Sequence, residues 1–285
     1  MKNITVSIIG VGLIGGSFGK AIKNSKLKIK KVIGVGRHIE KLKIAKKIGA
    51  IDEYTTDFIE GIKNADIVMV ATPVNTIVPI IKKILPYIKP DCLITDVGSV
   101  KKQIVKEIKY QNFVGAHPLA GSEKIGVQYS SPEIFKNATV AITPLENTSK
   151  SAIKKVSELW KSIGAKILVI SPEEHDYIVA ITSHLPHILS SAFVNIVWQE
   201  NTRNKNISKL LAGSFRDFTR ISDSDPYNWS EICYYNQNKI EKQLKKYIKI
   251  LKNLKIKNLL SFFSQAKNKR WQLLQSNQKK ESITH

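Results

Sequence analysis

The N-terminal segment Ile4–Ala21 reads ITVSIIGVGLIGGSFGKA. A short apolar run meets the pattern Gly-x-Gly-x-x-Gly, and a helix-compatible segment follows it directly. This is the dinucleotide-binding fingerprint in the context that it requires, between a strand and the N-terminus of a helix. The first glycine permits a tight turn, the second lets the backbone approach a pyrophosphate, and the third lets the helix pack closely on the strand. The fingerprint therefore predicts cofactor contacts from Gly10, Gly12, Leu13, Ile14 and Gly15.

From Lys31 to Ile170, apolar runs of strand length alternate with segments of helix length. Such alternation is typical of a parallel sheet with helices on both faces. After Ser171 and Pro172 the chain reads as helices, and Pro186 is expected to kink the first of them. The sequence thus predicts a Rossmann-type, doubly wound and mostly parallel α/β domain over residues 1–171. An all-α domain over 172–275 and a disordered tail over 276–285 should follow, with the helices forming a homodimer surface.

The composition is that of a chain able to bury a core, with 285 residues of which 42% are hydrophobic. Glycines interrupt the early apolar run, and no window approaches the roughly 18 uninterrupted apolar residues of a spanning helix. We therefore expect a cytoplasmic protein without a membrane partner. Cys92 and Cys233 lie far apart in the sequence and fit neither a disulfide framework nor a zinc pattern.

The formal net charge of +22 raises nucleic-acid binding as an alternative. Only five of the 45 basic residues are arginines, and the lysines are spread over every expected helix. This distribution favours a solvated lysine surface over a specific nucleic-acid site. The charge can still concentrate an anionic substrate or cofactor by long-range attraction.

The residues after the second expected strand bear on the choice of cofactor. A site that prefers NAD usually carries an acidic residue about 20 positions past the glycines, to bind the ribose 2′-hydroxyl. This chain has Gly36-Arg37-His38 there. A cation in place of an acid suits a 2′-phosphate, so Arg37 and His38 predict NADP, with NAD and a merely exposed Arg37 as the alternatives.

Residues that follow strands are further candidates, because ligands of open α/β sheets gather at the carboxyl ends of the strands. Thr72, Pro73, Gly98 and Ser99 occupy such positions, although plain turn chemistry explains each of them about as well. His117 follows another strand and begins a loop rich in small residues. A neutral imidazole there can accept a proton near pH 7, and we expect its ionisation at about pH 6–7.

The helical part contributes a second group of candidates. His184 and His187 are spaced to share one helix face. Arg216 and Arg220 are two of the few arginines in a lysine-rich chain, which indicates planar, bidentate recognition of a carboxylate. Each histidine also has a structural alternative, and a metal site built from His117, His184 and His187 has no supporting pattern.

Taken together, these segments resemble the prephenate/arogenate dehydrogenase family of tyrosine biosynthesis over nearly the whole chain. The motifs that carry the resemblance are Gly10–Gly15, Asp96–Lys101, Gly115–Glu123, Ser183–His187 and Gly213–Ile221. Gly36-Arg37-His38 is similar to the NADP-dependent, cyanobacterial-type arogenate enzymes of the family and departs from its NAD-dependent members.

The resemblance implies oxidative decarboxylation of arogenate or prephenate, with hydride transfer to NADP. It implies that His117 accepts a hydrogen bond from the ring hydroxyl being oxidised and that Ser99 helps to orient this arrangement. It also implies that His187 and Arg220 hold the substrate's side chain and carboxylate, with Ser122 and Arg216 as secondary contacts. The choice between the two substrates and between NADP and NAD stays open.

Two other classes of function remain alternatives. One is a 3-hydroxyacid dehydrogenase or imine reductase of the same two-domain plan, which should use a catalytic lysine or lack the His117-Pro118 pair. The other is a cofactor-sensing or nucleic-acid-binding protein that uses the lysine surface. Binding that survives physiological salt would distinguish the second, because non-specific lysine contacts weaken as salt rises.

Overall fold

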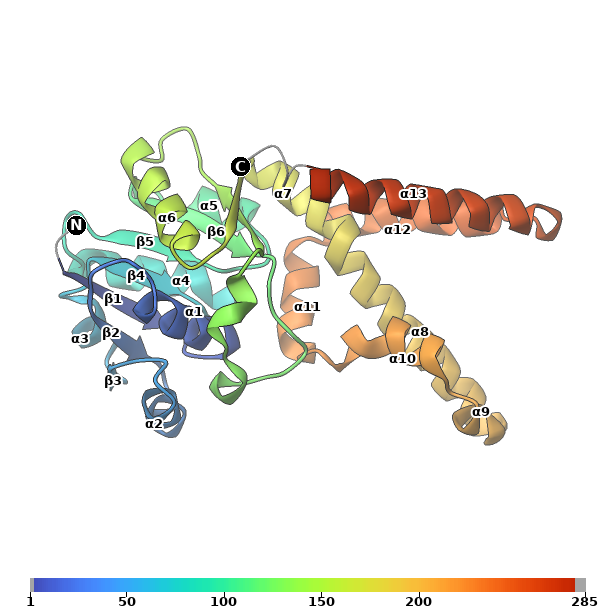
Figure 1. Cartoon of the computed structure of the whole chain (residues 1–285), viewed down its shortest axis with the longest axis horizontal. Helices are drawn as coiled ribbons and strands as arrows, with labels where there is room; N and C mark the ends of the chain where they lie inside the picture. Colours follow the sequence, from blue (N-terminus) through green and yellow to red (C-terminus); the bar gives the residue numbers. More distant parts are fainter. Residues whose placement is uncertain (1–2, 280–285) are drawn as a thin grey trace. The chain divides into compact units, whose positions relative to one another are not determined.

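A single eight-stranded sheet forms the first part of the computed structural model, which describes residues 3–279 (Figure 1). Its strands are β1 (Ile4–Ile9), β2 (Ile29–Val35), β3 (Glu53–Thr55), β4 (Ile67–Val70), β5 (Leu93–Asp96), β6 (Phe113–Pro118), β7 (Thr139–Thr143) and β8 (Lys166–Val169). Their order is β3-β2-β1-β4-β5-β6-β7-β8, and all neighbours are parallel except β6 and β7. The predicted doubly wound, mostly parallel sheet is confirmed.

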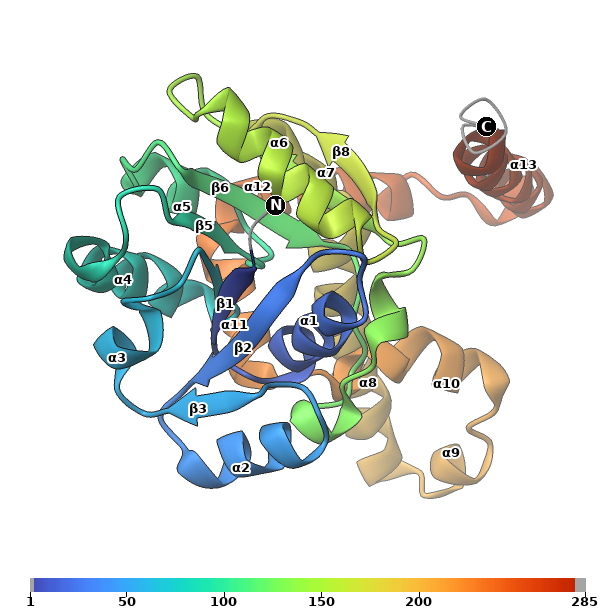
Figure 2. The same ribbon diagram turned by 60° about the vertical axis from the view of Figure 1, so that its left-hand side comes forward.

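Helices cover both faces of this sheet, because successive side chains of a buried strand point to opposite faces. In β1, Ile8 belongs to one core and Ile9 to the other. The first core is completed by α1 (Leu13–Lys23), α2 (Ile39–Lys47) and α6 (Lys150–Lys161). The second is completed by α3 (Phe58–Ile62), α4 (Val74–Ile84) and α5 (Lys102–Glu107) (Figure 2).

No further strand follows β8 in the described residues. The helices there are α7 (Pro172–Val179), α8 (Leu185–Arg203), α9 (Asn206–Lys209), α10 (Gly213–Thr219), α11 (Pro226–Tyr235), α12 (Gln237–Lys252) and α13 (Leu259–Lys279). A π-helical turn, Ala180–His184, joins α7 to α8. It ends just before Pro186, whose missing N–H cannot close a regular α-helical turn. The predicted irregularity at Pro186 is therefore this turn.

The chain separates into two compact units, Met1–Ile240 and Glu241–His285. The division after residue 171, inferred from the end of the strand–helix alternation, stays a prediction. Helices beyond that point pack on the sheet: Asp176 of α7 binds the start of α5, and Ile232 of α11 is part of the second core. Of the tail expected to be disordered, residues 276–279 belong to α13, and residues 280–285 lie outside the described residues.

One stretch of helix, Pro172–Arg203, is long and apolar enough to cross a membrane by length and composition, with a mean hydropathy of 1.3. A single stretch of this kind is weak evidence, since core helices meet the same criterion. Its N-terminal part carries the buried polar residues His175, Asp176 and His184, and the first two bond to the sheet-bearing part of the chain.

Candidate active site

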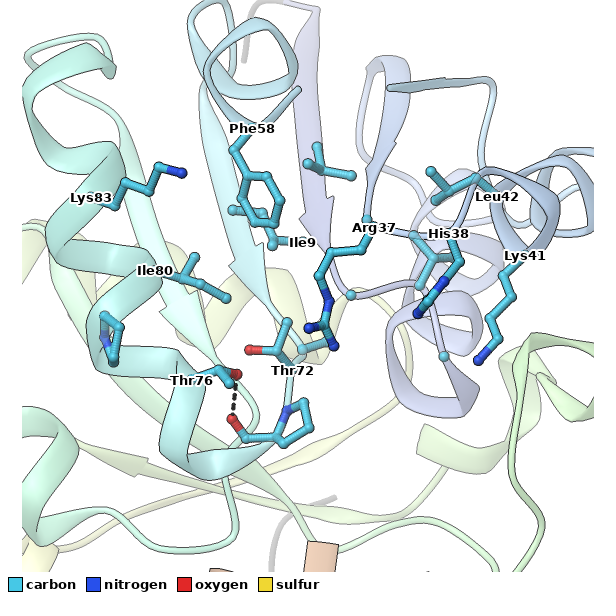
Figure 3. Close-up of a pocket in the computed structure, with 18 of the residues that line it drawn as sticks. Ile9, Arg37, His38, Lys41, Leu42, Phe58, Thr72, Thr76, Ile80 and Lys83 are labelled. Atoms are coloured by element: carbon cyan, nitrogen blue, oxygen red, sulfur yellow. Dashed lines mark hydrogen bonds between the residues drawn. The ribbon is translucent and has the colours of Figure 1, made fainter. Parts of the chain in front are cut away.

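A cleft of about 580 Å³ lies at the carboxyl ends of β1, β2 and β4 (Figure 3). Its lining includes the expected cofactor residues Gly10, Gly12, Arg37, His38, Thr72 and Pro73. Lys41 and Lys83, which the sequence analysis missed, also line it. The side chains of Arg37, His38 and Lys41 come from the end of β2 and the start of α2 and lie along one side of the cleft (Figure 3).

The glycine turn has the geometry that a dinucleotide requires. Gly10 has a φ of +92°, and a Cβ there would lie 2.5 Å from the carbonyl oxygen of Ala71. A Cβ on Gly12 would meet nothing within 4 Å, so the backbone is open on this side. Gly12 also precedes α1, whose first turn has neither a side-chain cap nor an acidic residue. The free N–H groups of this turn suit a pyrophosphate.

A polar atom in the cleft supports the same fit. The Oγ1 atom of Thr72 is buried and has no hydrogen-bond partner among the described residues. A buried hydroxyl without a partner is energetically costly, so a ligand that bonds to it would recover that cost. The residues present therefore fit a nicotinamide dinucleotide.

Four expected cofactor residues are not in the lining of the cleft: Leu13, Ile14, Gly15 and Gly98. Gly15 is needed for packing, because a Cβ there would lie 2.2 Å from the carbonyl oxygen of Gly10. Gly98 is buried, and its N–H donates to Asp96 at 2.8 Å. A Cβ on Gly98 would press on the side chains of α4 and α5. Both glycines thus serve close packing beside the cleft.

The buried end of β6 carries His117, which contacts a second histidine. His117 Nδ1 lies 2.8 Å from Nε2 of His175 in α7, and the two rings meet edge to face. His175 Nδ1 donates to Oδ1 of Asp176 at 2.8 Å. Asp176 also accepts the backbone N–H groups of Lys101 and Lys102 at 2.8 and 3.1 Å. This chain of hydrogen bonds joins β6 through α7 to the start of α5.

Lys101 and Asp96 form an ion pair that is wholly buried. Lys101 Nζ also donates to the carbonyl of Ala116 at 2.8 Å, and Asp96 accepts the N–H of Ala116 at 3.2 Å. Burial lowers the pKa of Lys101, and Asp96 opposes this effect. The pair therefore fixes the backbone of the residue directly before His117.

Burial holds the pKa of His117 well below its usual range, and the neighbouring His175, Lys101 and His184 add to this effect. Burial also lowers the pKa of His175, although Asp176 acts in the opposite direction. For Asp176, burial raises the pKa, but the hydrogen bonds that it accepts outweigh burial and the pKa is lowered. At neutral pH the group consists of two neutral imidazoles beside a carboxylate. The direction of this pKa shift differs from the ionisation at about pH 6–7 that was expected from the sequence.

Two further histidines, His184 and His187, contact the ring of Trp229 in α11. His187 stacks on the indole, with ring centroids 3.3 Å apart, and its Nδ1 donates to the carbonyl of Ser183 at 3.0 Å. His184 is buried, and its Nδ1 accepts from the amide of Asn236 at 3.1 Å. Burial lowers the pKa of both rings, to about 4 for His184. His184 Nε2 has no hydrogen-bond partner within the described part of the chain.

Three of the four remaining candidates lie at the surface. Arg220 follows α10, and its guanidinium lies 2.8 Å from the carboxylate of Glu123 in the loop after β6. Arg216 and Ser122 are exposed. Ser99 is half-buried between β5 and α5, and β5 pairs with β6, the strand that contains His117. Over residues 3–279, no group of three or more His, Cys, Asp or Glu is arranged to hold a metal ion.

The partners of the histidines were not predicted from the sequence: His175, Asp176, Lys101, Asn236 and Trp229. Lys101 lay within a quoted motif, but nothing in its sequence context indicates burial. His175 and Asp176 are adjacent polar residues near the start of a helix, where exposed residues are common. Only their contacts with residues 58 to 75 positions away reveal them.

A parallel sheet with a glycine turn, a cofactor-sized cleft and a buried imidazole at the carboxyl edge defines a class, the dinucleotide-dependent oxidoreductases. Comparison with known families gives the narrower assignment. The family model for the nucleotide-binding domain of prephenate dehydrogenase matches residues 18–169, and the model for its dimerization domain matches residues 171–275. The chain belongs to the prephenate dehydrogenase family, and the resemblance drawn from its motifs is confirmed.

Individual relatives agree with this assignment. Prephenate dehydrogenase of Bacillus subtilis is 35% identical in an alignment 280 residues long, and the match covers 93% of this chain and 75% of that protein. Prephenate dehydrogenase of Aquifex aeolicus, solved with hydroxyphenyl propionate and NAD+, has a TM-score of 0.85 and 34% identity, covering 99% of both chains. Synechocystis arogenate dehydrogenase has a TM-score of 0.74 and 27% identity, covering 99% of this chain and 100% of that one. The protein is thus an oxidoreductase with prephenate/arogenate dehydrogenase function.

Proposed function

We propose that this protein prefers NADP and carries out the oxidative decarboxylation of arogenate or prephenate that leads to L-tyrosine. The observation that carries the cofactor preference is the group of Arg37, His38 and Lys41 along one side of the cleft, where an acidic residue would bind a free ribose 2′-hydroxyl. A cationic group favours the additional phosphate of NADP. The Aquifex relative is solved with NAD+, so the proposed preference for NADP distinguishes this protein from that relative.

In the proposed reaction, a nicotinamide cofactor bound in the cleft would supply the acceptor for the hydride that leaves the ring carbon bearing the hydroxyl. His117 accepts the proton of that hydroxyl, and loss of carbon dioxide leaves an aromatic ring. His117 suits this role because it is neutral at physiological pH and lies at the carboxyl edge of the sheet. Ser99, at the end of the adjacent strand, is proposed to orient the hydroxyl beside it.

Arg220 is proposed to bind the ring carboxylate of the substrate. It now pairs with Glu123, and more than half of its side chain is exposed, so a substrate carboxylate can replace this partner at little cost. A planar guanidinium can bond a carboxylate with two parallel hydrogen bonds. Arg216 and Ser122, exposed near the same loop and helix, are proposed as secondary contacts.

His187 favours arogenate over prephenate in this proposal. Its Nδ1 donates to a backbone carbonyl, so a neutral ring offers only an acceptor at Nε2. Burial lowers its pKa and keeps the ring neutral. Such a nitrogen can accept a hydrogen bond from the ammonium of arogenate, whereas the keto acid side chain of prephenate has no donor to offer.

We also propose that the protein is a cytoplasmic homodimer. The match of residues 171–275 to the dimerization domain of the family supports the dimer. Exposed apolar side chains in this region, such as Trp198 and Leu210, support an interface there as well.

Steady-state kinetics with arogenate and prephenate, each with NADP and NAD, test the proposal. The highest kcat/KM is expected for arogenate with NADP. A higher kcat/KM with NAD than with NADP would contradict the cofactor assignment. A higher kcat/KM with prephenate than with arogenate would contradict the role of His187.

A further inference from the structure

His117 and His175 are linked in a way that constrains where their protons lie. The 2.8 Å contact between His117 Nδ1 and His175 Nε2 needs one hydrogen, which either ring could supply. The second contact of His175 decides the question. Its Nδ1 lies 2.8 Å from the carboxylate of Asp176, which accepts and cannot donate while it is ionised.

Asp176 is held in the ionised form by its surroundings. Both of its oxygens accept backbone N–H groups, from Lys101 and Lys102, in addition to the bond from His175. These bonds lower the pKa of Asp176 despite its burial. His175 Nδ1 therefore carries a hydrogen and donates it to Asp176.

The position of one hydrogen fixes the next. Burial lowers the pKa of His175, so the ring is neutral and its Nε2 has a lone pair in place of a hydrogen. The contact then requires His117 Nδ1 to be the donor. His117 Nε2, the other nitrogen of that ring, is left with its lone pair.

The surrounding charges favour the same arrangement. Lys101 from the turn before α5 and His184 from the π-helical turn disfavour a positive charge on His117. Asp96 in β5 neutralises Lys101. Asp176 of α7 is then the carboxylate that is connected to His117, through the ring of His175. A proton that arrives on His117 Nε2 would thus be stabilised through His175 by the charge of Asp176.

We propose that His175 and Asp176 are positioning residues that fix the tautomer of His117 so that Nε2 accepts the substrate's proton. The catalytic consequence of this inference rests on the proposed function. The hydrogen positions themselves rest on the structure alone. Neither residue needs to touch the substrate in order to act.

The first experiment observes the tautomer without substrate. The full chain is labelled with ¹⁵N-histidine, and the ring nitrogens are recorded by NMR at about pH 7.5, with the His117→Asn spectrum assigning the signals of His117. The expected result is a neutral ring protonated at Nδ1. A ring of His117 protonated at Nε2 would overturn the inference. Because no substrate is present, this result does not depend on the reaction.

The second experiment compares two replacements at one position. In His175→Gln, the side-chain oxygen can still accept from His117 Nδ1, whereas His175→Phe keeps the bulk and removes the acceptor. We expect His175→Phe to lower kcat by about 10- to 100-fold and to leave the KM for NADP unchanged. His175→Gln should recover most of this loss and keep the tautomer signal of His117.

A purely structural role makes a different prediction. His175→Phe would then turn over at the parental rate or lose activity only in proportion to lost folded protein, with no rescue by His175→Gln. Either result would overturn the inference. If His175→Phe does not fold, the test uses the NMR spectra of the parent and of His175→Gln. A His117 ring protonated at Nε2 in these spectra would also overturn the inference. A parent enzyme inactive with both substrates would instead contradict the proposed function and leave the tautomer measurement valid.

Discussion

The cofactor cleft and the surroundings of His117 lie on one sheet but are built in different ways. The cleft is open, and its residues Arg37 and His38 are exposed. His117 is buried, and its partners come from a strand, a turn and a helix far apart in the sequence. The cleft therefore binds by charge and backbone shape at its surface, whereas the His117 site depends on a buried network of hydrogen bonds.

The cleft thus serves the binding of the cofactor, and the network around His117 serves the chemical step. A change in the cleft should alter one ligand contact and leave the rest of the protein intact. A change in the network should alter the proton positions, the stability of the fold, or both, because each residue of the network is bonded to another.

The largest effect is expected from removing the proton acceptor. His117→Asn should lower kcat by roughly 10²–10⁴, because general base catalysis contributes that much. Binding of NADP, measured by fluorescence or calorimetry, should be unchanged, since the cleft does not include His117. A variant with near-parental kcat would show that another group accepts the proton.

Breaking the buried ion pair should have a large effect on stability. Lys101→Met leaves the carboxylate of Asp96 buried without its charged partner, and we expect a loss of about 3–5 kcal/mol in the free energy of unfolding. The matched control is Lys63→Met, which breaks an exposed pair with Glu60 and should cost less than about 1 kcal/mol. Urea unfolding measures both, and equal losses would remove the distinction between the two kinds of pair.

The sequence was sufficient for those parts of the molecule that follow local rules. The fingerprint Gly10–Gly15 and the strand–helix alternation predicted the sheet, because turn geometry and apolar runs are local properties. The antiparallel pairing of β6 with β7 was not predicted, since either direction suits an apolar run. The motifs also indicated His117, but through resemblance to a family and not through its surroundings.

The partners of His117 could not be predicted because their role arises only on folding. His175 is distinguished from an exposed helical histidine by its contact with a residue 58 positions earlier. Lys101 is one of many lysines, and nothing near it in the sequence marks it as buried. Gly98 was expected from its position after a strand to contact the cofactor, which stays a prediction; its close packing beside α4 and α5 was not expected.

Arg220, which pairs with Glu123 in the loop after β6, should affect substrate binding alone. Arg220→Lys keeps the charge but loses the planar fork, so we expect the KM for substrate to rise by about 10- to 100-fold. Affinity for NADP should not change. If the lysine variant binds substrate as the parent does, another group anchors the carboxylate.

Within the cleft, Arg37→Ala should weaken NADP binding by about 1.5–3 kcal/mol, the usual contribution of a charge-assisted hydrogen bond. Binding of NAD should change little, because it lacks the 2′-phosphate. Lys83→Ala is a useful comparison, since Lys83 lines the same cleft from α4. Equal losses for NADP and NAD in Arg37→Ala would contradict a phosphate contact.

The smallest expected effect is the response of the parent enzyme to mild acid, and it distinguishes a buried histidine from an exposed one. Burial lowers the pKa of His117 well below 6.5, so the ring remains a proton acceptor as the pH falls from 7.5 to 6. We expect kcat/KM to change by less than about twofold over this interval and to fall only at lower pH, where His117 becomes protonated. An exposed histidine, with a pKa of about 6.5, would already be mostly protonated at pH 6. The measurement is a profile of kcat/KM against pH at saturating NADP, with stability checked at each pH by activity after return to pH 7.5. A fall centred between pH 6 and 7 would mean that the site around His117 opens to solvent before the substrate reacts, and that the contrast between the open cleft and the closed network does not hold in the working enzyme.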